Sequence, residues 1–483
     1  MMQLSGTDSL FLSTEMPTWH QHVGGLIVVD PADSDRFSFE AVRARMLESL
    51  EVVPKFRYRL KDVPMHLGRP VWVEDDDFSL DRHLRRIAAA PPGGRREVAD
   101  LLGMLCSQQL DRRRPLWEMW YVDGVVGGQV AIMSKYHHCI MDGAASAGLA
   151  DQLLDIEPDP APRARATVDP GSGPAAPSDL GLLARSVVPL ATSPLRMVDY
   201  GLRAAQRGLV VLRERNDHPL PRGAPGPCFN GAVGPRRGSA FASVALDDVR
   251  AVKDALGVKL NDVALALVAG SVRAHLWRHG EVPDGELVAG VPLSTRAGGD
   301  GDGGGGDGGG EAANQVAIMN VLLATRVDDP VARVHAIHAS AVSAKALTQE
   351  IRSHRITSVG EVVPPLLLHL GTRAAWSADV GRRMPVLQNV LVSNVAGPPF
   401  PLYLCGAKVS GIYASSVLVG NQGLNITLMS YMDRVDFGIT ADPDLVDDTW
   451  EFADGIAAAL AELMDAAGLG APTPVDDAFS RAR

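Results

Sequence analysis

A run of seven residues at 137–143 carries the side chains in this sequence that are best suited to moving a proton. Two adjacent imidazoles, His137 and His138, precede a carboxylate at Asp142 and a glycine at Gly143. A neutral imidazole can accept a proton near neutral pH, because its ordinary pKa lies close to that value. The full pattern, HHxxxDG, therefore favours general-base chemistry over the simpler alternative, in which the histidines lie in a loop and Asp142 caps a helix.

The neighbouring segments are expected to place this motif where a strand ends and a helix begins. Residues 129–136 are apolar and partly alternate, as the residues of a strand do, and residues 144–156 have the pattern of a helix. Adjacent residues of an extended chain point to opposite faces of a sheet. Only one of the two histidines can therefore easily face a substrate.

The length and charge of the chain limit its architecture and its partners. A chain of 483 residues is too long for a single core and predicts two domains. We expect a first domain over 1–160, a linker with an amphipathic helix over 161–227, and a second domain over 228–483. The net charge of −11 argues against non-specific binding of nucleic acids, which requires a basic surface.

Cysteine spacing and hydropathy indicate neither a metal centre nor a secreted protein. The cysteines lack the paired spacing of a zinc site or a disulfide framework, so we expect no metal. Cys139 lies inside the motif and could supply a thiol nucleophile, although a small packed residue is the more ordinary role. No signal-peptide pattern and no run of about 18 apolar residues is found, which predicts a cytoplasmic protein without a membrane span.

Several further stretches make the chain similar, almost end to end, to one family. HHxxxDG is the signature of the CoA-dependent acyltransferase superfamily, which also contains the condensation domains of peptide synthesis. The order and spacing of the other stretches resemble the bacterial wax ester synthase/diacylglycerol acyltransferase family. These stretches are residues 4–8, 22–25, 54–60, 70–73, 114–118, 259–263, 292–296 and 393–398. The first two resemble the family's opening strand.

This resemblance implies a fold and a reaction. The fold would be α/β, of the α+β type, with two chloramphenicol-acetyltransferase-like domains of mixed sheets flanked by helices, and an active-site channel between them. The reaction would transfer a long-chain acyl group from acyl-CoA to diacylglycerol or a fatty alcohol, with acyl-CoA as a substrate and no cofactor. His138 would be the general base that deprotonates the alcohol, and His137 would be its structural neighbour. No covalent acyl-enzyme is required, because a thioester already has a good leaving group.

The carboxylate of the motif is expected to hold its loop in shape rather than to assist the base. In the family, this aspartate turns away from the base and pairs with an arginine. Arg57 is the first candidate partner for Asp142, and Arg59 is the second. Gly143 is expected to permit a tight turn and a close approach of the following helix.

Two of the family-like stretches supply candidate residues of a substrate channel. The first stretch resembles a PLW motif and would shape the first domain beside the channel, although its tryptophan is equally suited to the core; it comprises Pro115, Leu116 and Trp117. The second stretch, Asn261 and Asp262, resembles an ND motif. Asn261 is expected to be the N-cap of a helix over 263–276, and this structural role is weighed against a direct role in catalysis.

Two other functions stay open as alternatives. One is a condensation-type acyltransferase that forms amides on carrier-bound substrates, which the PLW-like and ND-like stretches and the lack of a recognisable carrier domain disfavour. The other is a non-catalytic lipid-surface-binding protein with a vestigial motif. Free thiol release from acyl-CoA that depends on an added alcohol distinguishes the O-acyltransferase from the lipid-surface-binding protein. Replacing the alcohol with a carrier-bound amine distinguishes it from the condensation-type enzyme.

Nearly insoluble substrates predict attachment to the periphery of a membrane or a lipid droplet. The helix expected over 195–213 has an apolar stripe and arginines on its other face, as interfacial helices do. The alternative is that the stripe packs between the two domains. Residues 364–368 are a second candidate anchor. The insertion at 298–310 contains only glycine and aspartate and is expected to be a flexible surface loop.

Overall fold

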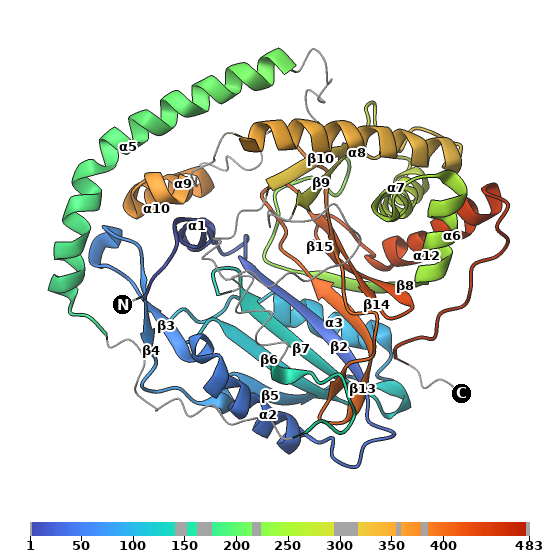
Figure 1. Ribbon diagram of the computed structural model, residues 1–483, viewed down its shortest axis with the longest axis horizontal. Helices are drawn as coiled ribbons and strands as arrows, with labels where there is room; N and C mark the ends of the chain where they lie inside the picture. The colour runs from blue at the N-terminus through green and yellow to red at the C-terminus, as the bar shows by residue number, and fades with distance from the viewer. Residues whose placement is uncertain are drawn as a thin grey trace.

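Two six-stranded mixed sheets with helices packed on them organise the chain (Figure 1). The computed structural model describes residues 2–140, 152–161, 176–214, 224–293, 317–353, 359–377 and 385–479. In spatial order, the strands of the first sheet are β12 (Tyr403–Leu404), β13 (Ala407–Ser415), β2 (His22–Asp30), β7 (Val130–His137), β6 (Trp117–Asp123) and β5 (Leu84–Ala88). This architecture confirms the predicted fold class of mixed sheets flanked by helices.

The second sheet contains an antiparallel hairpin, β14 and β15, from the last part of the sequence. Its strands, in spatial order, are β10 (Ala317–Leu322), β9 (Val288–Leu293), β11 (Val390–Val395), β14 (Leu424–Tyr431), β15 (Arg434–Ala441) and β8 (Gly238–Ala245). β14 and β15 pair antiparallel from end to end, whereas β11 runs parallel to both β9 and β14. A small third sheet is formed by β1 (Met2–Gln3), β4 (Val71–Glu74) and β3 (Tyr58–Lys61).

The helices cover the sheets and fill the space beside them. α6, α7, α8 and α12 pack together beside the second sheet, and α7 is buried along most of its length (Figure 1). The helices are α1 (Gly6–Thr14), α2 (Phe39–Val52), α3 (Arg95–Cys106), α5 (Asp179–Glu214), α6 (Leu246–Leu256), α7 (Leu260–Arg278), α8 (Pro330–Ser353), α9 (Val359–Val362), α10 (Pro365–Ser377) and α12 (Trp450–Ala466). Short 3-10 turns lie at η1 (Pro54–Arg57), η2 (Pro64–His66), η3 (Leu80–Arg82) and η4 (Val126–Gly128).

Strand β13 joins the two halves of the molecule. It comes from the second half of the sequence but pairs with β2 in the first sheet, where it lies between β12 and β2. It also packs on β15 through buried polar groups: Asp436 accepts hydrogen bonds from the Ile412 amide (2.9 Å), the Ser243 hydroxyl (2.6 Å) and Arg434 Nε (2.7 Å). The Tyr413 hydroxyl lies 3.0 Å from Ser243 Oγ and from Arg434 Nη2. Two opposite charges buried away from water stabilise a fold only when hydrogen bonds also satisfy their polar atoms, as the bonds to this pair do.

The first family-like stretch forms a helix rather than the expected strand. Ser5 is the N-cap of α1, and its hydroxyl accepts a hydrogen bond from the Asp8 amide (3.0 Å). A serine three residues before an acidic residue favours the start of a helix, since it satisfies an amide that has no partner within the helix. The expectation of a strand over 4–8 is therefore wrong, while 22–25 does lie in β2.

Helix α5 begins 16 residues earlier than predicted, at Asp179 rather than at 195. It runs through Pro189 and Pro194, each of which lacks the amide that normally bonds the carbonyl four residues back. The Ser193 hydroxyl donates to the Leu190 carbonyl (2.7 Å), which is the group that Pro194 leaves without its usual donor. This local replacement explains why Pro194 does not end the helix.

Among the described residues, no single helix combines the length and hydropathy needed to cross a membrane. Helices α6 and α7 meet these criteria only when taken together, and they are bent by 105° with respect to each other. The motif helix expected over 144–156, residues 294–296 and the insertion at 298–310 lie wholly or mostly outside the described residues.

Candidate active site

The backbone of both motif histidines is fixed by neighbouring strands. His137 is the last residue of β7, and its amide donates to the Leu116 carbonyl beside β6 (2.9 Å). The amide of His138 donates to the carbonyl of Gln21, which precedes β2 (2.8 Å). The motif thus begins at the end of a central strand of the first sheet, and its backbone is bonded on both sides. This position agrees with the strand end predicted from the sequence.

The side chain of His137 is enclosed, and its contacts are those of a structural residue. It is fully buried, and Nδ1 accepts a hydrogen bond from the Cys139 amide (3.2 Å). The neutral ring therefore carries its proton on Nε2, which lies 3.7 Å from Oε1 of Glu15. Burial, with smaller effects of Arg112 and His138, lowers the pKa of His137 well below its ordinary value. Arg112 also pairs with Glu15 (2.7 Å), which places the end of α1 beside the motif.

The side chain of His138 is half-buried, in contrast to that of its neighbour. Its ring stacks on Phe11 of α1, with 4.0 Å between the ring centroids and 18° between the planes. Burial lowers the pKa of His138. The ring is therefore neutral at neutral pH, in the protonation state that a general base needs.

The PLW-like stretch packs in the core next to the motif and supports it. The Trp117 ring is fully buried, its Nε1 donates to the Phe56 carbonyl (2.7 Å), and it stacks on the His83 ring at 4.6 Å. Leu116, also fully buried, supplies the carbonyl that accepts from His137. The Pro115 carbonyl accepts from the Trp117 amide (2.9 Å). These contacts give the stretch a place in the core that fixes the end of β7.

The two candidate arginine partners of the motif aspartate pair with other carboxylates. Arg57 lies 3.2 Å from Glu74, and Arg59 lies 3.5 Å from Asp75. Both pairs are partly exposed. Asp142 and Gly143 are outside the described residues, so the pairing of Asp142 with Arg57 or Arg59 stays a prediction.

The ND-like pair lies in the first turn of α7, not at its cap. The N-cap is Lys259, and its amide donates to the Asp262 carboxylate (2.9 Å). The expectation that Asn261 is the N-cap is wrong, because Asp262 bonds back to position 259 and so moves the helix start upstream. Asp262 is buried and also accepts from His338 Nδ1 (2.6 Å).

The amide of Asn394 connects two family-like stretches that are far apart in the sequence. Its Nδ2 donates to Oδ1 of Asn261 (3.2 Å), so the start of α7 meets the end of β11. Among the described residues, no hydrogen bond or ion pair links Asn261 or Asp262 to the motif histidines. The sequence-predicted site residues therefore form two separate groups: the PLW-like stretch with the histidines, and the ND-like pair with Asn394 and His338.

Comparison with known proteins assigns the whole chain to one family. The model of the wax ester synthase/diacylglycerol acyltransferase catalytic domain matches residues 4–264, and that of the family's C-terminal domain matches residues 312–464. A Mycobacterium tuberculosis protein named a diacylglycerol O-acyltransferase is 35% identical over an alignment of 481 residues that covers 96% of this chain and 90% of that protein. This chain belongs to the wax ester synthase/diacylglycerol acyltransferase family. The predicted family is thereby confirmed.

Further relatives of this wax ester synthase/diacylglycerol acyltransferase chain support the family assignment by their sequence and their fold. A Mycobacterium bovis protein with the same type of name is 34% identical over 89% of this chain and 92% of its own length. The solved structure of a wax ester synthase/diacylglycerol acyltransferase from Marinobacter aquaeolei VT8 matches with a TM-score of 0.67 and 27% identity, over 97% of this chain and all of the other. The starter condensation domain of rhizomide synthetase, at 12% identity and a TM-score of 0.50, shares the fold alone.

Some residues around the motif of this family member were not found from the sequence. Three of these residues contact the two histidines or their partners, namely Phe11, Glu15 and Arg112. Phe11 and Glu15 lie more than 100 positions upstream of the motif. Arg112 stands three residues before Pro115, where the PLW-like stretch begins, and this proximity is the one signal that could have suggested it. His338 contacts Asp262 from α8, and no local pattern marks it.

Proposed function

We propose that this chain transfers a long-chain acyl group from acyl-CoA to the hydroxyl group of diacylglycerol or a fatty alcohol, with His138 as the general base. The family supports the reaction class, and the contrast between the two imidazoles supports the assignment of the base. His137 is fully enclosed and uses Nδ1 as an acceptor within its own loop. His138 is half-buried and neutral, and so it is the imidazole of the pair that a substrate can reach.

The reaction needs one proton transfer and one exchange at the thioester carbonyl. The hydroxyl oxygen of the acceptor attacks this carbonyl carbon while the His138 imidazole takes the hydroxyl proton. The carbon–sulfur bond then breaks, CoA leaves as its thiol with that proton, and an ester remains. The stacking of His138 on Phe11 fixes the plane of the ring and limits the side-chain entropy that is lost when the alcohol binds.

Parallel acceptors offer the direct test of the substrate class. Purified full-length protein would be given palmitoyl-CoA with diacylglycerol, with hexadecanol, with a carrier-bound amine, or with no acceptor. We expect CoA thiol release, together with the matching ester, only in the alcohol-containing reactions. Release with the amine alone would favour condensation chemistry, and release in none of the reactions would favour a non-catalytic lipid-binding protein.

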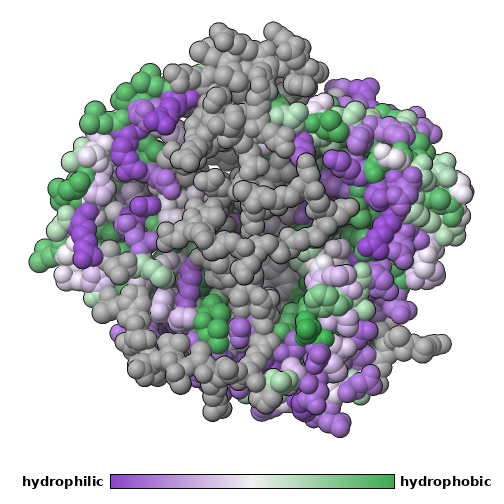
Figure 2. Space-filling view, in the orientation of Figure 1, coloured by the Kyte–Doolittle hydropathy of each residue, from purple (hydrophilic) through white to green (hydrophobic). Residues whose placement is uncertain are grey.

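The acceptor lipids are nearly insoluble, which favours work at a lipid surface, and α5 is the element suited to contact it. The apolar residues of its stripe are exposed: Leu195 by 76%, and Val198 and Leu202 by 63% each. Figure 2 shows apolar residues on the outer rim of the molecule, where α5 lies in Figure 1. An exposed apolar stripe on a long helix is the feature of an interfacial helix, whereas an interdomain strut would bury it.

A further inference from the structure

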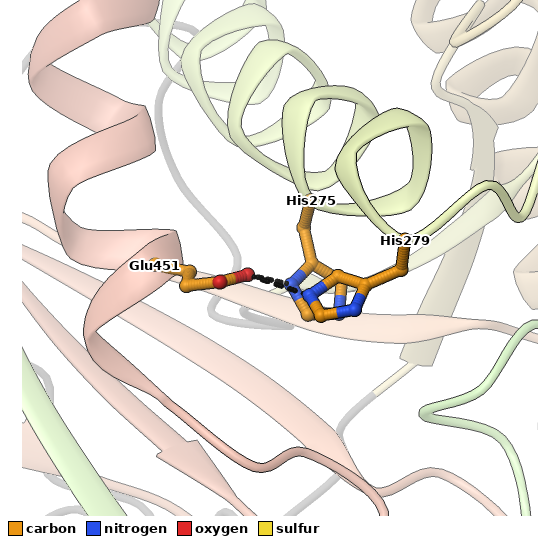
Figure 3. A group of neighbouring side chains, drawn as sticks. All are labelled: His275, His279 and Glu451. Carbon is orange, nitrogen blue, oxygen red and sulfur yellow. Dashed lines mark hydrogen bonds and ion pairs between the residues drawn. The ribbon is translucent and has the colours of Figure 1, made fainter.

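Three side chains that can bind a metal meet where the end of α7 approaches the start of α12 (Figure 3). His275 and His279 lie one helical turn apart, and Glu451 lies in the first turn of α12. Oε2 of Glu451 is 2.7 Å from Nδ1 of His275 and 3.0 Å from Nε2 of His279. The three ligand atoms all lie within 4.8 Å of one another.

The arrangement of donor atoms suits a tetrahedral dication. Two histidines at positions i and i+4 of a helix, with one carboxylate, make up a three-ligand zinc set that leaves a fourth position for water. Bonds of about 2.0–2.2 Å in a tetrahedron separate neighbouring ligand atoms by roughly 3.3 Å. The Glu451–imidazole distances would therefore need to lengthen by only roughly 0.3–0.6 Å on binding, and both histidine rings already point to the same carboxylate oxygen (Figure 3).

The surroundings leave the site open on one side. The His275 side chain is 4% exposed, whereas those of Glu451 and His279 are 20% and 42% exposed, so that an ion can enter from solvent past His279. The C-terminal end of α7 carries partial negative charge, which favours a cation. Arg278 contacts the other carboxylate oxygen, Oε1, at 3.1 Å and leaves Oε2 to the histidines.

Cys228 is close to the cluster but on the other side of the His275 ring. Its Sγ lies 3.6 Å from Nε2 of His275, while Glu451 faces Nδ1. An ion bound beside Glu451 takes Nδ1 of His275, whereas Cys228 faces Nε2 on the opposite side of that ring, so Cys228 is a neighbour of the set rather than a member of it.

We propose that His275, His279 and Glu451 bind one Zn²⁺ ion, with water as the fourth ligand, and that this ion ties the end of α7 to the start of α12. Cysteine spacing could not have indicated this set, because it uses two histidines and a carboxylate that are brought together by the fold. The site lies about 21 Å along α7 from Asn261, at roughly 1.5 Å per residue. We expect the ion to act on stability, because it would join the end of α7 to the start of α12.

Zinc titration of the metal-free full chain tests the proposal. We expect calorimetry to show binding of one Zn²⁺ per chain and a higher melting temperature with zinc, because a ligand of the native state stabilises it. His279→Gln removes one ligand from an exposed position and should weaken binding by more than the roughly 10–100-fold that loss of a supporting contact costs. Glu451→Gln should do the same.

Two matched variants and one spectrum separate this site from other zinc-binding groups. His335→Gln removes an exposed histidine from α8 and should leave affinity unchanged, as should Cys228→Ser. With Co²⁺ in place of Zn²⁺, we expect tetrahedral visible bands without a thiolate charge-transfer band. Equal zinc affinity of the wild type and His279→Gln, or the absence of stoichiometric binding, would mean that the cluster is held by hydrogen bonds alone. A thiolate band lost in Cys228→Ser would place the ion on the other side of His275 and overturn the proposed ligand set.

Discussion

The environment of His138 has a direct consequence for the pH dependence of catalysis. A base works only in its neutral form, so activity should fall as the pH drops through the pKa of His138. Burial lowers this pKa from the ordinary 6.5, so we expect the acidic limb of kcat/KM to have its midpoint below 6.5 and activity to be constant from pH 7 to 8. Phe11→Ala should expose the ring and move the midpoint upward. A midpoint above 7 in the wild type would contradict a buried, uncharged base.

The motif aspartate and its predicted arginine partner form a second test at the scale of single residues. Asp142→Asn and Arg57→Gln should each lower activity, and the double variant should lose little more than the worse single variant if the two residues form one pair. The double variant has to be compared with both single variants because Arg57 also contacts Glu74. Arg57→Gln therefore has an effect of its own. Fully additive losses in kcat would exclude Arg57 and make Arg59 the next candidate.

Among the elements, α5 is the one whose function depends on an exposed surface. Full burial of an apolar side chain is worth about 1.5–3 kcal/mol, so Leu195→Ser, Val198→Ser and Leu202→Ser together should lower binding to anionic vesicles by at least about tenfold. The matched control, Asp199→Ser with Arg203→Ser, removes an exposed ion pair of the same helix without a change in net charge and should leave vesicle flotation nearly unchanged. Equal flotation of both variants and the wild type would assign lipid contact to another element.

Local sequence patterns predicted the strands better than the helix starts. The strand expected over 129–136 agrees with β7, because its apolar, partly alternating residues define it locally. The starts of α5 and α7 were misplaced. Both starts carry side-chain hydrogen bonds, to Ser178 from the Gly181 amide in α5 and to Asp262 from the Lys259 amide in α7, which the spacing of apolar residues does not reveal.

The site could be predicted from sequence only in part, for a reason that concerns distance along the chain. The motif histidines and the PLW-like stretch lie within one sheet and were recognised from their own residues. Phe11 and His338 reach the two groups of site residues from elements remote in sequence, and β13 crosses to β2 over more than 370 residues. Such pairings are decided by the packing of the whole chain rather than by any local pattern.

At the scale of the whole molecule, the buried polar network of β13 and β15 should carry much of the stability that joins the halves. Asp436→Asn leaves Arg434 buried without its charged partner, and breaking a buried pair costs about 3–5 kcal/mol. Asp247→Asn breaks an exposed pair with Arg250 and should cost about 1 kcal/mol at most. Urea unfolding of both variants gives the comparison. Equal losses would show that the network does not join the halves.

The central claim is that acyl transfer depends on the imidazole of His138 and not on that of His137. Steady-state transfer from palmitoyl-CoA to the preferred alcohol should be measured for His138→Ala and His137→Ala, with circular dichroism and melting temperature recorded for each. We expect His138→Ala to lower kcat by about 10²–10⁴-fold with an unchanged fold. His137→Ala should lose stability, because it empties a buried position, but should keep more activity below its melting temperature. Activity of His138→Ala close to that of the wild type, or the reverse order of the two variants, would contradict the assignment of the base.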